Sequence, residues 1–89
     1  MSLMSMITSA QIRCGRFALR WSVQELAERS KVSTSTIKRV ESENGIPGAT
    51  AVNIAALKAT LEAAGIEFIG SPNDGPGIRI HRPDQSASD

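Results

Sequence analysis

The sequence is poor in aromatic residues and in the side chains that most enzymes use for catalysis. Among its 89 residues the aromatic ones are Phe17, Trp21 and Phe68, tyrosine is absent, and Cys14 and His81 are the single cysteine and histidine. One cysteine excludes an intramolecular disulfide and a cysteine-based zinc site. His81 has no cysteine or aspartate at the spacing of a metal ligand or of a nucleophilic pair. We therefore expect an aliphatic core, no metal or cofactor, and no catalytic activity.

Long apolar runs are also absent. No stretch approaches the roughly 20 apolar residues that span a bilayer. The first six residues are too few and carry too little charge for a secretory signal. A chain of 89 residues with 40% hydrophobic residues can bury one modest core. The sequence therefore predicts a single cytoplasmic domain without a membrane segment.

The net charge is only +1, but the charges are distributed unevenly along the chain. Residues 11–39 hold seven Lys or Arg and two Glu, a local charge of +5, whereas residues 41–67 hold one Lys and four Glu, a local charge of −3. A basic surface opposite an acidic one can orient a protein on a polyanion such as DNA. An accidental scatter of charges is the alternative interpretation.

Residues 22–44 read as two short helices joined by a tight turn. Ser22 and Glu25 have the S-x-x-E spacing of a capping box, in which two side chains satisfy backbone N–H groups at a helix start. Helical spacing is then interrupted, and Ser33 follows as a second N-cap residue. This arrangement predicts a helix-turn-helix.

The second of these helices has an inward stripe, Ile37 and Val40, and an outward face without carboxylates. The outward face consists of Thr34, Ser35, Lys38 and Arg39. Small hydroxyl residues permit close approach, and the two cations can reach phosphates or base edges. For one helix alone, the solvated side of an amphipathic helix is the simpler interpretation. The capped helix just upstream, with the small Ala27 where two helices would cross, favours a nucleic-acid face.

Further helices are expected on either side of this pair. Thr8 and Gln11 form another capping box, which opens a helix running to about Arg20. Thr50 caps a helix over 51–64, and Gly65 follows it as a left-handed C′ residue.

After Gly65 the apolar pattern changes to an alternating one. Two short β-like segments, 66–69 and 77–81, are separated by a loop over 70–76 that is rich in Gly and Pro. The expected organisation is an N-terminal extension (1–7), a helix-turn-helix domain (8–65), a β-hairpin (66–82) and a disordered tail (83–89).

This pattern resembles the Cro/repressor-type, or XRE-type, helix-turn-helix family. The residues that match at the family's spacing lie within residues 8–64 and are Arg16, Leu19, Ser22, Glu25, Leu26, Ala27, Val32, Ser33, Ile37, Val40 and Glu41. Two positions depart from the family pattern: Val23 replaces a Gln that often contacts phosphate, and Lys31 replaces the usual Gly of the turn. The resemblance implies a mainly α fold, a compact four-helix, lambda-repressor-like domain, here followed by a short β-hairpin.

The resemblance also implies a function: a sequence-specific regulator of transcription, most simply a repressor, that binds double-stranded DNA with residues 34–43 in the major groove. The expected base contacts are Thr34, Ser35 and Arg39, and the expected phosphate contacts are Arg13, Gln24, Ser33, Thr36 and Lys38. Arg16 and Glu41 are expected to form a structural ion pair. Family members usually bind two half-sites as homodimers, so we expect a homodimer.

The hairpin leaves two questions open. Its apolar residues, Ile66, Phe68, Ile69, Ile78 and Ile80, need cover, either from a second copy or from the fourth helix. The alternative function is an antitoxin-like or adaptor module, in which the hairpin or tail would hold a toxin protein and DNA binding would be secondary.

Overall fold

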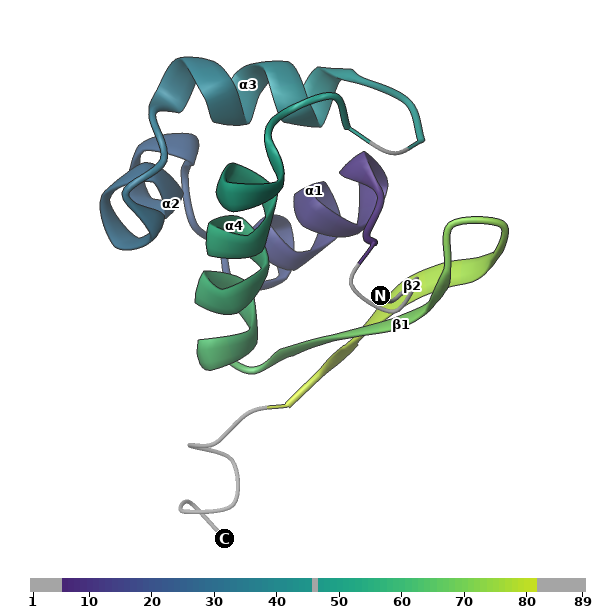
Figure 1. Cartoon of the computed structure of the whole chain (residues 1–89). Coiled ribbons are helices and arrows are strands. Elements are labelled where there is room, and N and C mark those ends of the chain that lie inside the picture. Colours follow the sequence, from purple (N-terminus) through teal and green to yellow (C-terminus); the bar gives the residue numbers. More distant parts are fainter. Residues whose placement is uncertain (1–5, 46, 82–89) are drawn as a thin grey trace, which may run out of the picture.

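The structure is a computed structural model, which describes residues 6–45 and 47–81. Over these residues the chain forms four helices and a two-stranded antiparallel sheet (Figure 1). The elements are α1 (Ser9–Ala18), α2 (Val23–Ser30), α3 (Thr34–Ser42), α4 (Ala51–Ala63), β1 (Ile66–Ser71) and β2 (Asp74–Ile80). The predicted mainly helical fold with a C-terminal hairpin is confirmed. The tail expected over 83–89 and most of the N-terminal extension lie outside the described residues.

Every helix begins at a hydroxyl residue whose oxygen accepts a hydrogen bond from the backbone N–H three residues later. These N-cap residues are Thr8, Ser22, Ser33 and Thr50. The capping box of Thr8 and Gln11 is complete, since Thr8 N–H also donates to Gln11 Oε1 over 2.8 Å. The capping box predicted at Ser22 is only half formed. Ser22 Oγ accepts from the Glu25 N–H, but the Glu25 side chain does not accept from the Ser22 N–H. The Glu25 carboxylate accepts from Arg29 Nε at 2.6 Å instead, because Arg29 lies one turn later on the same helix face.

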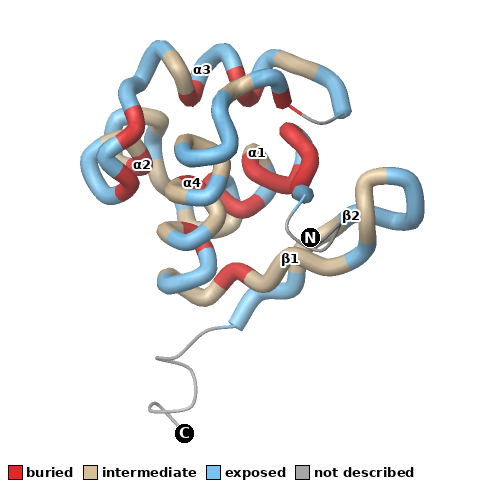
Figure 2. Tube along the Cα trace, viewed as in Figure 1, coloured by how far each residue is buried: buried red, intermediate tan, exposed pale blue. Residues whose placement is uncertain are grey.

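The core lies where the four helices meet and extends onto the first residue of β1. Figure 2 shows the buried segments on the facing sides of the helices. The buried apolar residues are Ile7, Ile12, Leu26, Val32, Ile37, Val40, Leu57, Leu61 and Ile66. Gly15 brings α1 close to β1, since a Cβ atom there would lie only 3.3 Å from Ile66 Cγ2. A Cβ atom at this position would require the Ile66 side chain to shift by a few tenths of an ångström.

The hairpin is longer than the sequence pattern predicts. The loop predicted over 70–76 is wrong, because both strands continue through it to a two-residue turn at Pro72 and Asn73. Gly70 allows this continuation: its φ is +75°, the register shifts beside it, and a Cβ atom there would lie 2.2 Å from the Gly75 carbonyl oxygen.

The hairpin packs on α1 and α4 of its own chain. Ile66 is buried, and Phe68 and Ile78, which face each other across the strands, pack half-buried against the core. A side chain from α1 adds two polar contacts, since Gln11 Nε2 donates to the carbonyls of Ile69 (3.0 Å) and Gly77 (2.8 Å). The fourth helix and α1 thus provide most of the cover that the hairpin needs.

Candidate nucleic-acid interface

The turn between α2 and α3 is set by a left-handed residue. Lys31 has φ 67° and ψ 20°, and its N–H closes α2 by donating to the Ala27 carbonyl over 2.8 Å. Ser30 then accepts from the Val32 N–H at 3.2 Å, and both of these residues are buried. A left-handed lysine costs about 1–2 kcal/mol. The turn therefore has a left-handed residue at position 31, a conformation that glycine adopts without strain, although this chain has lysine there.

The outward face of α3 has the composition that the sequence predicts. Ile37 and Val40 are buried, and the exposed residues of the helix are Thr34, Ser35, Lys38, Arg39 and Ser42. The single carboxylate of α3, that of Glu41, turns inward and is 9% exposed. The exposed face therefore carries two positive charges and no negative charge. Figure 1 shows α3 lying across one end of the molecule.

Arg16 holds the Glu41 carboxylate in that inward position. Arg16 Nε lies 2.7 Å from Oε2 and Nη2 lies 2.7 Å from Oε1, while Nη1 donates to the Trp21 carbonyl over 2.9 Å. The expected ion pair is thus present as a buried, two-bond contact between α1 and the end of α3. Its hydrogen bonds, opposed by desolvation, raise the pKa of the Arg16 guanidinium.

Three of the expected DNA-contacting residues lie together at the N-terminal end of α3. Gln24, Ser33 and Thr34 line one shallow hollow, together with Lys31 and Glu28. The N-terminal N–H groups and the dipole of a helix favour an anion at such a position. Lys31 is a cation in this group that was not among the expected contacts. Its place in the turn is the signal that could have identified it.

Two expected phosphate contacts are partly occupied within the fold. Ser33 Oγ accepts from the Thr36 N–H at 3.2 Å and donates to Thr36 Oγ1 over 2.9 Å. Thr36 is half-buried, and its hydroxyl is hydrogen-bonded to the N-cap residue Ser33. Ser33 remains exposed.

Arg13 is engaged by the backbone of α3. Its guanidinium donates to the Glu41 carbonyl, at the C-terminal end of α3, where a cation satisfies an unpaired carbonyl. Arg29 is also engaged within the fold, by Glu25 and by the Trp21 ring 4.5 Å away. Of the seven cations in residues 11–39, the side chains of Arg20, Lys31, Lys38 and Arg39 are left exposed without an ion pair in the described structure.

Among residues 6–45 and 47–81, no group of three or more His, Cys, Asp or Glu could hold a metal ion. Within these residues no helix has both the length and the apolar character needed to cross a bilayer. Comparison of the chain with protein-family models, with curated proteins and with solved structures finds no match.

Proposed function

We propose that the protein is a sequence-specific regulator of transcription, most simply a repressor, built on a lambda-repressor-like helix-turn-helix domain that binds double-stranded DNA. The observation that carries this proposal is the exposed face of α3. It presents Thr34, Ser35, Lys38 and Arg39, and its one carboxylate is withdrawn into the ion pair with Arg16. A helix with small hydroxyl groups, two cations and no negative charge suits a polyanionic groove.

In this account α3 enters the major groove and α2 lies across the backbone. Arg39 donates two hydrogen bonds to guanine, and Thr34 and Ser35 contact neighbouring base edges. Lys38 contacts phosphate, as do Gln24 and Ser33 beside the start of α3. One such helix reads only a few base pairs, so two copies would bind half-sites about one helical turn apart. The regulator would act in the cytoplasm and would need neither a cofactor nor catalysis.

Selection of bound sequences from a random duplex library tests the proposal. The wild-type protein should enrich a palindromic consensus, because protein and operator symmetry match. A variant with both Lys38→Ala and Arg39→Ala should enrich none. Arg79→Ala is the matched control, since it removes an exposed cation from the hairpin and should leave the consensus unchanged. A wild-type protein that enriches no sequence, or the same consensus from the double variant, would contradict the proposal.

A further inference from the structure

Helix α4 is apolar on both of its sides. Leu57 and Leu61 face the core. The exposed residues of the helix are Ala51, Val52, Ala55, Ala59, Glu62 and Ala63. Five of these six are apolar, and Val52 is 77% exposed. A helix with apolar residues on both sides is normally covered on both, and this face of α4 lacks a partner among the described residues, 6–45 and 47–81.

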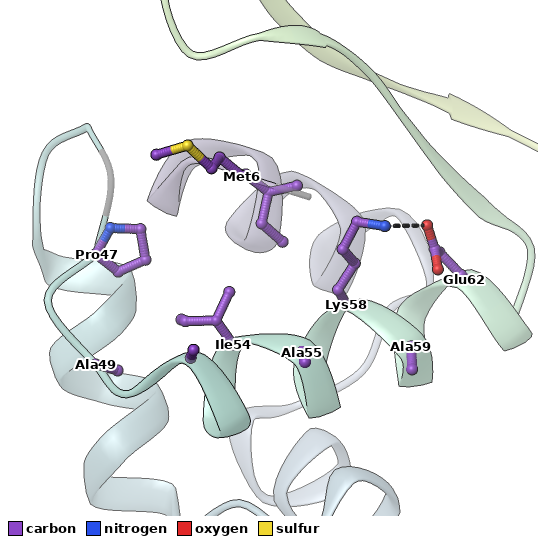
Figure 3. A pocket seen from close by; sticks show the side chains of 10 residues that line it. Met6, Pro47, Ala49, Ile54, Ala55, Lys58, Ala59 and Glu62 are labelled. Atoms are coloured by element: carbon purple, nitrogen blue, oxygen red, sulfur yellow. Dashed lines mark hydrogen bonds and ion pairs between the residues drawn. The ribbon is translucent and has the colours of Figure 1, made fainter. Parts of the chain in front are cut away.

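A hollow of about 540 Å³ lies beside this face. Figure 3 shows Met6 and Pro47 across the hollow from Ile54 and Ala55 of α4. The polar groups at its rim are those of Lys58 and Glu62, whose Nζ and Oε2 atoms are 2.8 Å apart. The hollow is therefore lined mainly by apolar side chains, and its two charges neutralise each other.

We propose that this surface, the exposed side of α4 with its adjoining hollow, binds the same surface of a second copy of the chain. The identity of this partner rests on the proposed function, because a regulator that binds two half-sites needs two copies of the chain. A two-fold contact brings the same surface of two copies together, so a surface with charge of one sign would repel the identical surface of the second copy. The α4 surface has no net charge, because Glu62 is paired with Lys58.

The shape of the surface also suits contact with itself. A self-complementary patch must contain both a projection and a recess. Val52 projects into solvent next to Ala51, which lines the hollow. Val52 of one copy can enter the hollow of the other, and the alanines on α4 allow the two helices to approach closely.

The hairpin is the competing surface, and most of its large apolar residues are buried or half-buried. Ile66 is buried and Phe68 and Ile78 are half-buried, which leaves Ile80, at 47% exposure, as the large apolar residue in solvent among the described strands. Helix α4 also runs away from α3, as Figure 1 shows. A contact through α4 therefore leaves the exposed face of α3 free for DNA.

Sedimentation velocity of the full chain without DNA, over a series of protein concentrations, tests this surface. Wild-type protein should dimerise, and Ala55→Glu should raise the dimer dissociation constant at least about 30-fold, since it brings two carboxylates into an apolar contact. Val52→Glu should do the same. Both positions are exposed and glutamate is a good helix former, so the fold should persist, which circular dichroism checks. Ala10→Glu, on the exposed side of α1, and Ile80→Glu, on the hairpin, should still dimerise.

Three results would overturn the inference: wild-type protein that stays monomeric at every concentration, Ala55→Glu and Val52→Glu proteins that dimerise normally, or disruption by Ile80→Glu instead. These results are separate from the test of function. A dimer held by α4 that selects no DNA sequence would leave this surface standing and contradict the proposed function. A monomer that selects a DNA sequence would do the reverse.

Discussion

Glu41 shows how one residue can serve both the fold and the surface. Its carboxylate joins α3 to α1 through Arg16, with two contacts of 2.7 Å in a buried position. The same contact keeps a negative charge away from the exposed face of α3. A residue that is turned inward can therefore determine the charge of the exposed face.

Removing this carboxylate should destabilise the protein strongly. Glu41→Ala leaves the Arg16 guanidinium buried without its partner, which should lower the free energy of unfolding by about 3 kcal/mol. Urea unfolding measures the change. Glu28→Ala is the control, because Glu28 is exposed and its loss should cost at most about 0.5 kcal/mol. Glu43 would be a poor control, since its carboxylate accepts from the Gly48 N–H at 2.7 Å. Equal losses from Glu41→Ala and Glu28→Ala would mean that the ion pair contributes nothing.

Lys38 and Arg39 are neighbours on α3 with different expected roles. Arg39→Ala should cost about 1–3 kcal/mol on the preferred site and relax discrimination at one base pair. Lys38→Ala should weaken binding to all sequences about equally, because phosphates carry no sequence information. Competition binding against single-base operator variants separates the two effects. If Lys38→Ala relaxes specificity and Arg39→Ala does not, the two roles are reversed.

At the scale of whole elements, the hairpin depends on a residue far away in the sequence. Gln11 uses Oε1 for the cap of α1 and Nε2 for the carbonyls of Ile69 and Gly77. One amide side chain thereby links a helix start to both strands. The sequence identifies only the local half of this arrangement, since S/T-x-x-E/Q spacing is a recognisable signal and a contact across 58 residues is not.

Gln11→Glu separates these two functions. Glutamate retains the cap, because it is a favoured residue at that position of a capping box. It loses the two donors and places a carboxylate against two carbonyls. Backbone amides of β1 and β2 should therefore exchange faster with solvent, while those of α2 and α3 keep their protection. Gln24→Glu, at an exposed position, is the matched control. Unchanged exchange in the strands would show that apolar packing alone holds the hairpin.

The outer face of the hairpin carries a small charged cluster. Glu67 Oε1 lies 2.7 Å from His81 Nε2 and 3.2 Å from Arg79 Nη1. The hydrogen bond to His81, followed by the charge of Arg79, lowers the pKa of the Glu67 carboxyl below its ordinary value of 4.5. A pKa that is lower in the folded state stabilises the fold above the unfolded pKa, and this stabilisation is lost as the pH falls through the folded value.

Glu67→Gln should therefore lower the melting temperature slightly near neutral pH, with a difference that disappears on acidification below pH 4.5. The effect should be small, because Glu67 is exposed to solvent. His81→Ala removes the largest cause of the pKa shift and should reproduce most of the change. A difference between wild type and Glu67→Gln that persists unchanged in acid would contradict this assignment.

Local signals in the sequence predict the elements well, and contacts between elements poorly. All four helix starts are marked by hydroxyl caps, at Thr8, Ser22, Ser33 and Thr50. These caps can be recognised in the sequence because an N-cap side chain bonds to a backbone N–H only three residues away. The extent of the strands was not predictable in this way. Gly70 and Pro72 read as a loop, although Gly70 has a positive φ beside the register shift and Pro72 lies in the two-residue turn of one continuous hairpin.

For the candidate site, sequence and structure agree on the face of α3 and differ on Arg13. The outward positions Thr34, Ser35, Lys38 and Arg39 follow from helical spacing alone. Arg13 is solvent-facing by the same spacing, but its guanidinium reaches the Glu41 carbonyl, which only the packing of α1 under α3 reveals.

At the scale of the whole molecule, the two proposed functions use different faces. The exposed side of α3 would bind DNA, and the exposed side of α4 would bind a second copy. The apolar content of α4 is plain in the sequence, but which of its residues stay in solvent depends on how α1, α2 and the hairpin cover it. The sequence also does not show which positive charges are available to a partner. Of the seven cations in residues 11–39, three (Arg13, Arg16 and Arg29) bind other groups of the same chain.

Salt dependence of binding to the selected duplex tests the central claim, that the α3 face binds DNA, most directly. The exposed cations without an ion pair in the described structure, four in each copy, would neutralise about five to seven phosphates per dimer. At roughly 0.9 each, these contacts predict a slope of about −5 to −6 for the logarithm of affinity against the logarithm of salt concentration. Lys38→Ala should make the slope shallower by about 2 per dimer, one contact from each copy. Arg79→Ala should leave it unchanged. An affinity that does not fall with salt, or a slope that Lys38→Ala leaves as it was, would contradict the account.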